Sequence, residues 1–287
     1  MRFKNTFLPV QNSLQSHGLL LDLSRPIVMG ILNATPDSFY NQGRGSALSD
    51  LLYSAEKMIA DGATILDIGG ASTKPGVARI NPSVEANRVL PLIKELHDAF
   101  PKVWLSIDTY HSQVAIEAVN AGVSIINDVS SGRFDSSMLE VVAQLKVPYI
   151  AMHMQGTPET MQINPQYEDV VYDVGAALKE TVNRCHQLGI LDIIIDPGFG
   201  FGKTVEQNFK LLQNMHSLRI LGKPILAGIS RKSMICKTLS LTPDEALNGT
   251  TALHMIALQQ GASILRVHDV REAMQAIKLF ETLQMAD

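Results

Sequence analysis

The feature of this sequence that most constrains its fold is a set of eight short, almost uninterrupted apolar runs. They occupy residues 26–32, 63–70, 103–109, 123–128, 147–153, 191–197, 224–230 and 262–268. Strands of a parallel sheet have this character, because helices cover both faces and no position alternates into water. The runs therefore predict an α/β protein with a parallel sheet enclosed by helices.

The segments between these runs have helical periodicity. In the last segment, one apolar stripe is predicted from Val270, Ala273, Met274, Ile277, Phe280 and Leu283. A glycine suited to a left-handed helix cap stands shortly before four of the strands: Gly62, Gly122, Gly189 and Gly261. The repeated order of strand, helix and glycine predicts one crossover helix for each strand.

Two architectures share this local pattern, a (β/α)8 TIM barrel and an open doubly wound sheet. All eight runs end in a polar residue, whereas an open sheet concentrates such residues beside one switch point, so the barrel is favoured. No linker interrupts the units, and the 287 residues are expected to form a single domain. We expect residues 26–287 to form the barrel and residues 1–25 to be a short N-terminal extension packed on it.

The composition excludes several other classes of protein. With 46% hydrophobic and 18% charged residues, the chain can bury a full core, unlike a disordered chain. A net charge of −4 without any basic run argues against nucleic-acid binding. No apolar stretch approaches the roughly 18 residues of a membrane helix, and Cys185 and Cys236 suggest no disulfide framework. We therefore expect a cytoplasmic protein without nucleic-acid or membrane partners.

Polar residues at the carboxyl ends of the strands are the first candidates for function, because barrel chemistry takes place there. They are Asn33, Asp67, Asp108, Asn127, Asp128, His153, Asp196, Ser230, Arg231, Lys232, Arg266 and His268. Each one alone is better explained as a helix cap or a structural group. Together, two carboxylates, an amide and a lysine form a polar ring suited to the edge of a purine-like or pterin-like heterocycle: Asp108, Asp196, Asn127 and Lys232.

A second group of strand-end residues suits a phosphate. Arg266 and His268 lie two positions apart on the last strand and point the same way. With Asn33 on the neighbouring first strand, they can hold an anion, because arginine grips phosphate with two parallel donors.

Three glycine-rich loops follow these strands. Residues 196–203 have a GxGxG spacing but lack the Gly-Lys-Ser/Thr order of a nucleotide P-loop. They predict a tight turn in which one of Phe199 and Phe201 packs into the barrel while the other faces a ligand. Residues 33–46 and 69–76 predict lids over the strand ends.

Several of these segments resemble, in order, the motifs of the bacterial dihydropteroate synthase family. They are MGILNATPDSF at 29–39, DIGGASTKPG at 67–76, SIDT at 106–109, INDV at 126–129, MHMQGTPETMQ at 152–162, DPGFGFGKT at 196–204, SRKSMI at 230–235 and RVHDV at 266–270. The resemblance implies a homodimeric TIM-barrel transferase of folate biosynthesis. Its members join 6-hydroxymethyl-7,8-dihydropterin pyrophosphate to p-aminobenzoate and release pyrophosphate, and sulfonamides compete with p-aminobenzoate.

The resemblance also implies roles for individual residues. The pterin-binding set is Asp108, Asn127, Met152, Asp196, Phe201, Lys232 and Arg266. The pyrophosphate-binding set is Asn33, Thr73, Lys74, Arg266 and His268, with the cofactor Mg2+ on Asn33. The p-aminobenzoate-binding set is Phe39, Thr73, Pro75, Phe201 and Ser233. The catalytic set, which stabilises charge while the pterin C–O bond breaks, is Asn33, Asp108, Lys232, Arg266 and His268.

Both lid segments depart from the family pattern. Asn41 stands where an aspartate is usual, and Ala71 and Lys74 replace an acid and an arginine. These changes leave open a pterin-binding paralogue with weak or no transferase activity. A pterin-dependent methyltransferase barrel with a corrinoid partner is a further alternative, but the motifs at 230–235 and 266–270 favour the synthase.

Overall fold

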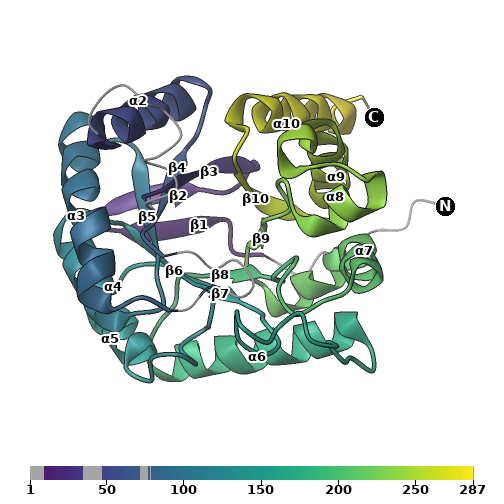
Figure 1. Ribbon diagram of the computed structural model, residues 1–287, viewed down its shortest axis with the longest axis horizontal. Helices are drawn as coiled ribbons and strands as arrows, with labels where there is room; N and C mark the ends of the chain where they lie inside the picture. The colour runs from purple at the N-terminus through teal and green to yellow at the C-terminus, as the bar shows by residue number, and fades with distance from the viewer. Residues whose placement is uncertain (1–9, 35–46, 72–76, 78, 287) are drawn as a thin grey trace.

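Figure 1 shows the computed structural model, which describes residues 10–34, 47–71, 77 and 79–286. Eight parallel strands close into a barrel. They are β3 (Ile27–Asn33), β4 (Ile65–Gly69), β5 (Trp104–Asp108), β6 (Ile125–Asp128), β7 (Tyr149–Met152), β8 (Ile193–Asp196), β9 (Ile225–Ala227) and β10 (Ala262–Val267), one for each predicted run. The last strand pairs with the first, with Ile264 opposite Ile27. The TIM barrel is therefore confirmed, and the open sheet is excluded.

Helices surround the barrel in Figure 1. The α-helices are α2 (Ala47–Ala60), α3 (Pro82–Ala99), α4 (Ser112–Asn120), α5 (Met138–Leu145), α6 (Val170–Gln187), α7 (Val205–Gln213), α8 (Ser233–Leu239), α9 (Leu247–Gln259) and α10 (Val270–Gln284). Two 3-10 helices are η1 (Met215–Leu221) and η2 (Pro243–Glu245). The four predicted cap glycines all have positive φ: Gly62, Gly122, Gly189 and Gly261. In the part of the chain that the structure describes, no helix has the length and apolar character needed to cross a membrane.

The apolar stripe predicted for α10 is confirmed except at its end. Val270, Ala273 and Ile277 are buried, and Phe280 packs against the same core. The prediction for Leu283 is wrong, because this side chain is 56% exposed. Leu283 lies in the last turn at the edge of the buried face, where the helix surface turns towards solvent.

The interior of the barrel is filled at its amino-terminal end by an apolar layer. One side chain from each strand contributes to it: Met29, Ile65, Trp104, Ile125, Ile150, Ile194, Leu226 and Ile264. A hairpin of β1 (Ser13–Ser16) and β2 (Leu19–Asp22) precedes the barrel, and its Leu14 and Leu21 belong to the same buried cluster. The hairpin therefore packs on this end of the barrel.

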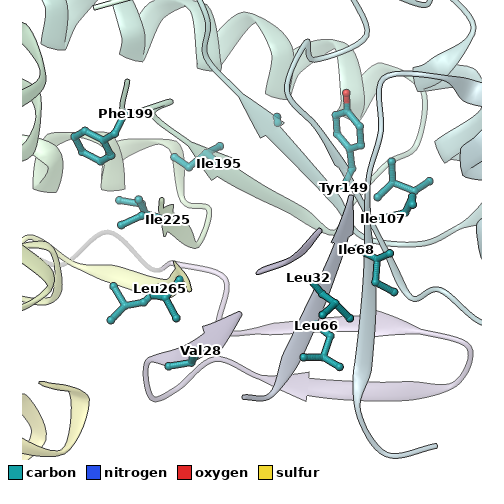
Figure 2. Close-up of a cluster of buried hydrophobic side chains, with 14 of the residues drawn as sticks. Val28, Leu32, Leu66, Ile68, Ile107, Tyr149, Ile195, Phe199, Ile225 and Leu265 are labelled. Carbon is teal, nitrogen blue, oxygen red and sulfur yellow. The ribbon is translucent and has the colours of Figure 1, made fainter. Parts of the chain in front are cut away.

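The outer face of the strands forms a second and larger apolar cluster with the helices. Figure 2 shows part of it, including Val28, Leu32, Leu66, Ile68, Ile107 and Leu265. Successive side chains of a strand point to opposite faces, so both faces are apolar along most of each strand. The strand ends are therefore held on a base that is packed from inside and outside.

Two glycines inside helices provide a matched test of the helix packing. A Cβ added at Gly249 of α9 would lie 2.6 Å from Cγ2 of Ile235 in α8, whereas one added at Gly175 of α6 would come no closer than 3.4 Å to Leu218. We expect Gly249→Ala to destabilise the protein by about 1–3 kcal/mol through overpacking. Gly175→Ala should stabilise it by about 0.5–1 kcal/mol through helix propensity. Urea unfolding measures both changes, and equal changes would contradict the close approach of α8 and α9.

Candidate active site

The candidate site lies directly above the apolar layer, at the carboxyl end of the barrel. Side chains two positions apart on a strand point the same way. Two residues beyond the apolar layer, five strands present Asp67, Asn127, Met152, Asp196 and Arg266 towards the barrel axis. The strands thus carry an apolar floor and, above it, the groups of the site.

Arg266 is the centre of a charged network in this site. Its Nε donates to Oδ2 of Asp67 and its Nη2 donates to Oδ2 of Asp108, both at 2.6 Å. Nδ2 of Asn127 donates to the same oxygen of Asp67 at 3.0 Å. The network joins β10 to β4, β5 and β6. It brings together three predicted site residues: Asp108, Asn127 and Arg266.

This network keeps Arg266 charged and concentrates negative charge around it. Burial opposes the charge, but Asp67 and Asp108 outweigh it and raise the pKa of Arg266 above its ordinary value. Burial also raises the pKa of Asp108, and the carboxylates Asp67 and Asp128 add to the rise. Arg266 opposes that rise, so Asp108 depends on the guanidinium to remain ionised.

Asp196, which ends β8, and Lys232, the N-cap of α8, both approach Gly228. A Cβ added at Gly228 would lie 3.9 Å from Oδ2 of Asp196 and 3.8 Å from Nζ of Lys232. The other oxygen of Asp196, Oδ1, accepts from the N–H of Gly198 at 2.7 Å. Burial lowers the pKa of Lys232 to about 8 and raises that of Asp196, because both charges lose water. Asp196, the predicted acceptor, and Lys232, the predicted donor, therefore lie beside the same glycine.

An apolar wall stands beside these polar groups. Its buried members are Tyr110, Val129, Met152, Met154 and Met161. Phe201 is partly buried against this wall, and the centroid of its ring lies 4.6 Å from Nζ of Lys232. Phe199 is fully buried in the outer cluster, and its carbonyl oxygen accepts from Nζ of Lys232. As predicted, one phenylalanine of the turn, Phe199, packs in the core, and the other, Phe201, lies at the candidate site.

Asn33 lies at the exposed rim of the site. A Cβ added at Gly69 would lie 3.5 Å from Oδ1 of Asn33 and 3.7 Å from Cβ of Asp108, so these two residues are neighbours. Within the described ranges, no three His, Cys, Asp or Glu side chains gather as metal ligands. The described part of the rim therefore offers single oxygen donors rather than a preformed metal cage.

His268 also lies at the exposed rim, two residues after Arg266. Oγ of Ser230 accepts from the backbone N–H of His268 at 3.2 Å and lies 3.0 Å from Nδ1 of the same residue. Partial burial of the ring and nearby cations, foremost Arg266, lower the pKa of His268 to about 4. The imidazole is therefore neutral at pH 7. The contact with Ser230 fixes the orientation of the ring, and a neutral imidazole has one N–H donor and one acceptor nitrogen.

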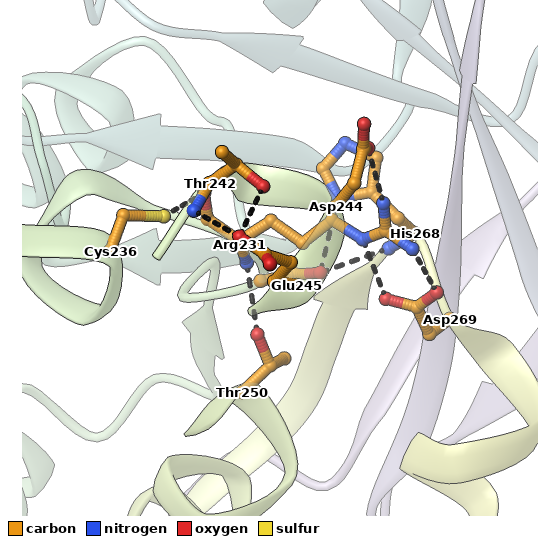
Figure 3. Close-up of polar contacts among 9 residues, drawn as sticks. Arg231, Cys236, Thr242, Asp244, Glu245, Thr250, His268 and Asp269 are labelled. Atoms are coloured by element: carbon orange, nitrogen blue, oxygen red, sulfur yellow. Dashed lines mark hydrogen bonds and ion pairs between the residues drawn. The ribbon is translucent and has the colours of Figure 1, made fainter. Parts of the chain in front are cut away.

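Arg231 has a structural role, although it adjoins Lys232. Figure 3 shows its guanidinium bound to Asp269, which accepts from Nε at 2.9 Å and from Nη2 at 2.7 Å. Nη1 of Arg231 also donates to Asp244 at 3.2 Å. These bonds tie the start of α8 to the start of α10 and neutralise Arg231 outside the network of Arg266.

The remaining predicted residues belong to the lids and to the start of α8. Four of them lie outside the described residues: Phe39, Thr73, Lys74 and Pro75. The substituted lid position Asn41 also lies outside. Ser233 is the exposed first residue of α8 and directly follows Lys232.

Local sequence patterns do not reveal the roles of three buried charged groups in this region. Asp67 is fully buried, and its signal is a carboxylate inside an apolar run, which requires a buried partner. Glu85 is buried in the first turn of α3, where burial raises its pKa to about 7. Lys203 is 3% exposed, and its Nζ lies 3.0 Å from Nδ1 of His153. Lys203 lies in the family motif DPGFGFGKT at 196–204, but that pattern does not reveal which groups its side chain binds.

Comparisons with known proteins agree with this geometry. Residues 29–268 match the model of the family described as pterin binding enzyme. Over 270 residues, the chain is 44% identical to dihydropteroate synthase of Haemophilus influenzae, covering 93% of this chain and 98% of the relative. The chain belongs to the dihydropteroate synthase family.

Solved structures of the family share the fold. Dihydropteroate synthase of Yersinia pestis with a sulfonamide drug complex has a TM-score of 0.90 and 42% identity, covering 95% of this chain and 99% of that one. The Xanthomonas albilineans enzyme with 4-aminobenzoic acid has a TM-score of 0.90 and 38% identity, covering 96% and 99%. The predicted family, the barrel and the class of enzyme, a transferase, are therefore confirmed. The comparisons give no support to the paralogue without transferase activity.

The charged network predicts how stability depends on pH. Arg266→Met leaves Asp67 and Asp108 buried without a cation, which should cost about 3–5 kcal/mol at pH 8. Because the pKa of Asp108 is raised in the folded protein, its protonation favours the fold, and this stability is lost as pH rises. Loss of Arg266 should raise the pKa of Asp108 further, so the variant gains more stability from protonation of Asp108 than the wild type does, and the cost should shrink at pH 5.5. Urea unfolding at both values measures it, with Arg231→Met as the control. An Arg266→Met cost that is equal at both pH values would contradict the network.

Proposed function

We propose that this protein transfers the dihydropterin group of 6-hydroxymethyl-7,8-dihydropterin pyrophosphate to p-aminobenzoate, forming 7,8-dihydropteroate and pyrophosphate. The observation that carries the proposal is that the side chains of Asp196 and Lys232 both approach Gly228, beside an apolar wall. A pterin presents N–H donors and acceptors on one edge and two flat faces. A carboxylate, an ammonium and an adjacent wall of methionine and phenylalanine match those three features.

The pterin edge is recognised by charged hydrogen bonds from the strand ends. Asp196 accepts from the pyrimidine N–H groups, and Lys232 donates to the ring acceptors. Asp108 and Asn127 take the opposite side of the bicycle, where Arg266 already orients them. The faces of the ring pack on the wall, on the side of Met152 and Phe201. This arrangement uses all the predicted pterin-binding residues.

Pyrophosphate leaves on the side of Arg266 and His268. Arg266 uses two of its five N–H donors on Asp67 and Asp108, and its remaining donors suit phosphate oxygens. His268 contributes a neutral imidazole, whose N–H donor binds an oxygen without carrying a charge of its own. Thr73 and Lys74 of the second lid add an anion contact in the proposal, as the family resemblance implies.

Asn33 fits a magnesium ion that arrives with the pyrophosphate. Mg2+ prefers oxygen ligands and keeps several waters, taking much of its shell from substrate phosphates. An exposed amide oxygen, with no cluster of three acidic or histidine ligands among the described residues, matches that mode of binding. Bound there, Mg2+ would offset the charge that grows on the leaving group.

The protein promotes the reaction by electrostatics, without a nucleophilic side chain. The C–O bond at the exocyclic methylene breaks first, and its electron pair leaves with pyrophosphate. The buried carboxylates Asp108 and Asp196 stabilise the pterin cation, and Arg266 and His268 stabilise the departing anion. The aniline nitrogen then attacks the methylene carbon and releases a proton to solvent.

The p-aminobenzoate ring occupies the outer side of Phe201. The contacts that the family resemblance implies are Phe39, Thr73, Pro75, Phe201 and Ser233. The Xanthomonas albilineans relative is solved with 4-aminobenzoic acid and the Yersinia pestis relative with a sulfonamide drug complex. We therefore expect sulfonamides to compete with p-aminobenzoate here.

We further propose that residues 26–287 form the catalytic barrel, that residues 1–25 are an accessory extension, and that the protein is a cytoplasmic homodimer. Cys185 and Cys236 are both free thiols, which agrees with a reducing compartment. Exposed apolar side chains on α10, such as Leu279 at 65% exposure, offer surface for a second copy.

Pterin binding tests the role of Asp196. Asp196→Asn removes the charge and turns an acceptor into a donor, so the affinity for a pterin should fall by about 10- to 100-fold. Isothermal titration calorimetry measures this affinity. Asp169→Asn on the outer helix α6 is the control and should bind normally. Normal pterin affinity in the Asp196 variant would overturn the assignment of the site.

The complete reaction tests both the activity and the metal. With both substrates and Mg2+, isotope-labelled p-aminobenzoate should appear in pteroate, and EDTA should stop its incorporation. Asn33→Ala should raise the Mg2+ concentration for half-maximal rate by about 10-fold, since one protein ligand is lost. A wild-type protein that binds pterin but incorporates no label would instead establish the paralogue. Identical Mg2+ titrations of wild type and variant would remove Asn33 from the metal site.

A further inference from the structure

The turn after β8, residues 197–202, carries Phe201. Side chains from outside the turn hold it by donating hydrogen bonds to its carbonyl oxygens. Five successive carbonyl oxygens accept hydrogen bonds from side chains: Gly198 and Phe201 from Lys203, Phe199 from Lys232, Gly200 from Gln162, and Gly202 from Tyr167. The N–H of Phe201 also donates to the oxygen of Gly198 at 3.1 Å. At Gly198, with φ of +70°, an added Cβ would overlap the carbonyl oxygen of His153. The turn is therefore a rigid element rather than a loose connection.

Lys203 contributes the most bonds to this turn. Its Nζ lies 2.9 Å from the oxygen of Gly198, 3.1 Å from that of Phe201 and 3.0 Å from Nδ1 of His153. An ammonium has three N–H donors, so these three acceptors use all of them. Lys203 has no donor left for a substrate, and its 3% exposure keeps it behind the turn.

The surroundings of Lys203 make its positive charge costly. Burial lowers the pKa of Lys203 to about 7, Lys232 adds to the fall, and Asp196 opposes it. Burial, with Lys203 and Arg133 nearby, lowers the pKa of His153 to about 2, so the imidazole is neutral and accepts the lysine N–H. A buried ammonium is expensive unless it is fully hydrogen-bonded. Here it is fully bonded, and two of its three partners are carbonyls of the turn.

We propose that Lys203 is a positioning residue for the second substrate: it fixes the turn so that Phe201 lies against the apolar wall beneath Lys232. This inference rests on the proposed function only in giving the outer side of Phe201 to the aromatic ring of p-aminobenzoate. Asp108, Asn127 and Arg266, which take one side of the pterin, stand outside the turn. Asp196 and Lys232 each bond to the turn once, at the N–H of Gly198 and the oxygen of Phe199, but Lys203 bonds to neither side chain. Loss of Lys203 should therefore affect p-aminobenzoate more than pterin.

Hydrogen exchange tests whether Lys203 holds the turn, independently of any activity. In Lys203→Met, the amides of residues 199–202 should exchange at least about 10-fold faster, because a local opening replaces a fixed turn. Amides of β5 and β6 should keep their rates. Lys210→Met is the matched control, since Lys210 is half exposed and pairs only with Asp169 in the described contacts. Unchanged exchange in 199–202 would overturn the proposal.

A double-mutant cycle tests whether Lys203 acts through Phe201. Lys203→Met should raise KM for p-aminobenzoate by about 10-fold, with kcat and pterin affinity changed less than about threefold. In a Phe201→Ala background, the same change should add little, because its target ring is absent. Additive effects, or an equal loss of pterin affinity, would show a merely structural lysine and overturn the proposal.

A second variant covers the case in which Lys203→Met does not fold. Gln162 is exposed and binds only the oxygen of Gly200 among the described contacts, so Gln162→Ala should fold and shift exchange and KM in the same direction by a smaller factor. If Gln162→Ala changed neither the exchange rates nor KM, this result would contradict the role of the turn as the positioning element. If the wild type formed no pteroate, the proposed function would fail, while hydrogen exchange would still decide the role of Lys203.

Discussion

The arrangement of the whole site depends on one guanidinium, that of Arg266. It bridges two carboxylates from adjacent strands, each at 2.6 Å, in a part of the barrel closed to water below. Without it, Asp67 and Asp108 would repel each other, and the pKa of Asp108 would rise further. With it, Asp108 stays available to a substrate and Asn127 is oriented through Asp67. The same arginine keeps donors for a leaving anion, so it links pterin recognition to departure of the pyrophosphate.

Three cations at the site, among the residues that the structure describes, are held in different ways, and this difference separates their tasks. Arg266 donates hydrogen bonds to carboxylates and keeps other donors for the proposed substrate. Lys203 donates all three of its N–H groups to the protein. Lys232 binds the carbonyl of Phe199 and lies over the ring of Phe201, close to Asp196. Burial lowers its pKa to about 8, so a hydrogen-bond acceptor on a bound substrate would stabilise its charged form. Lys232 is therefore the cation that suits the pterin.

The sequence predicted the fold closely, because strands covered on both faces are visible as apolar runs. Each run contains one strand, and closure of the barrel brings their polar ends to one side. The polar ring that includes Asp196 and Lys232 followed from that closure, and the family resemblance assigned it to the pterin edge. The partners of Arg266 did not follow, because they depend on which strands become neighbours when β10 meets β3. The predicted apolar stripe of α10 was wrong at Leu283, because periodicity alone does not show where a helix leaves its packing surface.

Gly228→Ala tests the central claim most directly, since it changes only the point where Asp196 and Lys232 meet. The new methyl group would touch Lys232, Asp196 and Leu226 at 3.8 to 3.9 Å, ordinary contact distances that the fold accepts. It would occupy the space that the pterin edge needs, so two charge-assisted bonds would be lost, at about 1.5–3 kcal/mol each. Calorimetry should show pterin affinity reduced by at least about 100-fold, with unfolding in urea unchanged. A folded variant that binds pterin as tightly as the wild type would contradict the account.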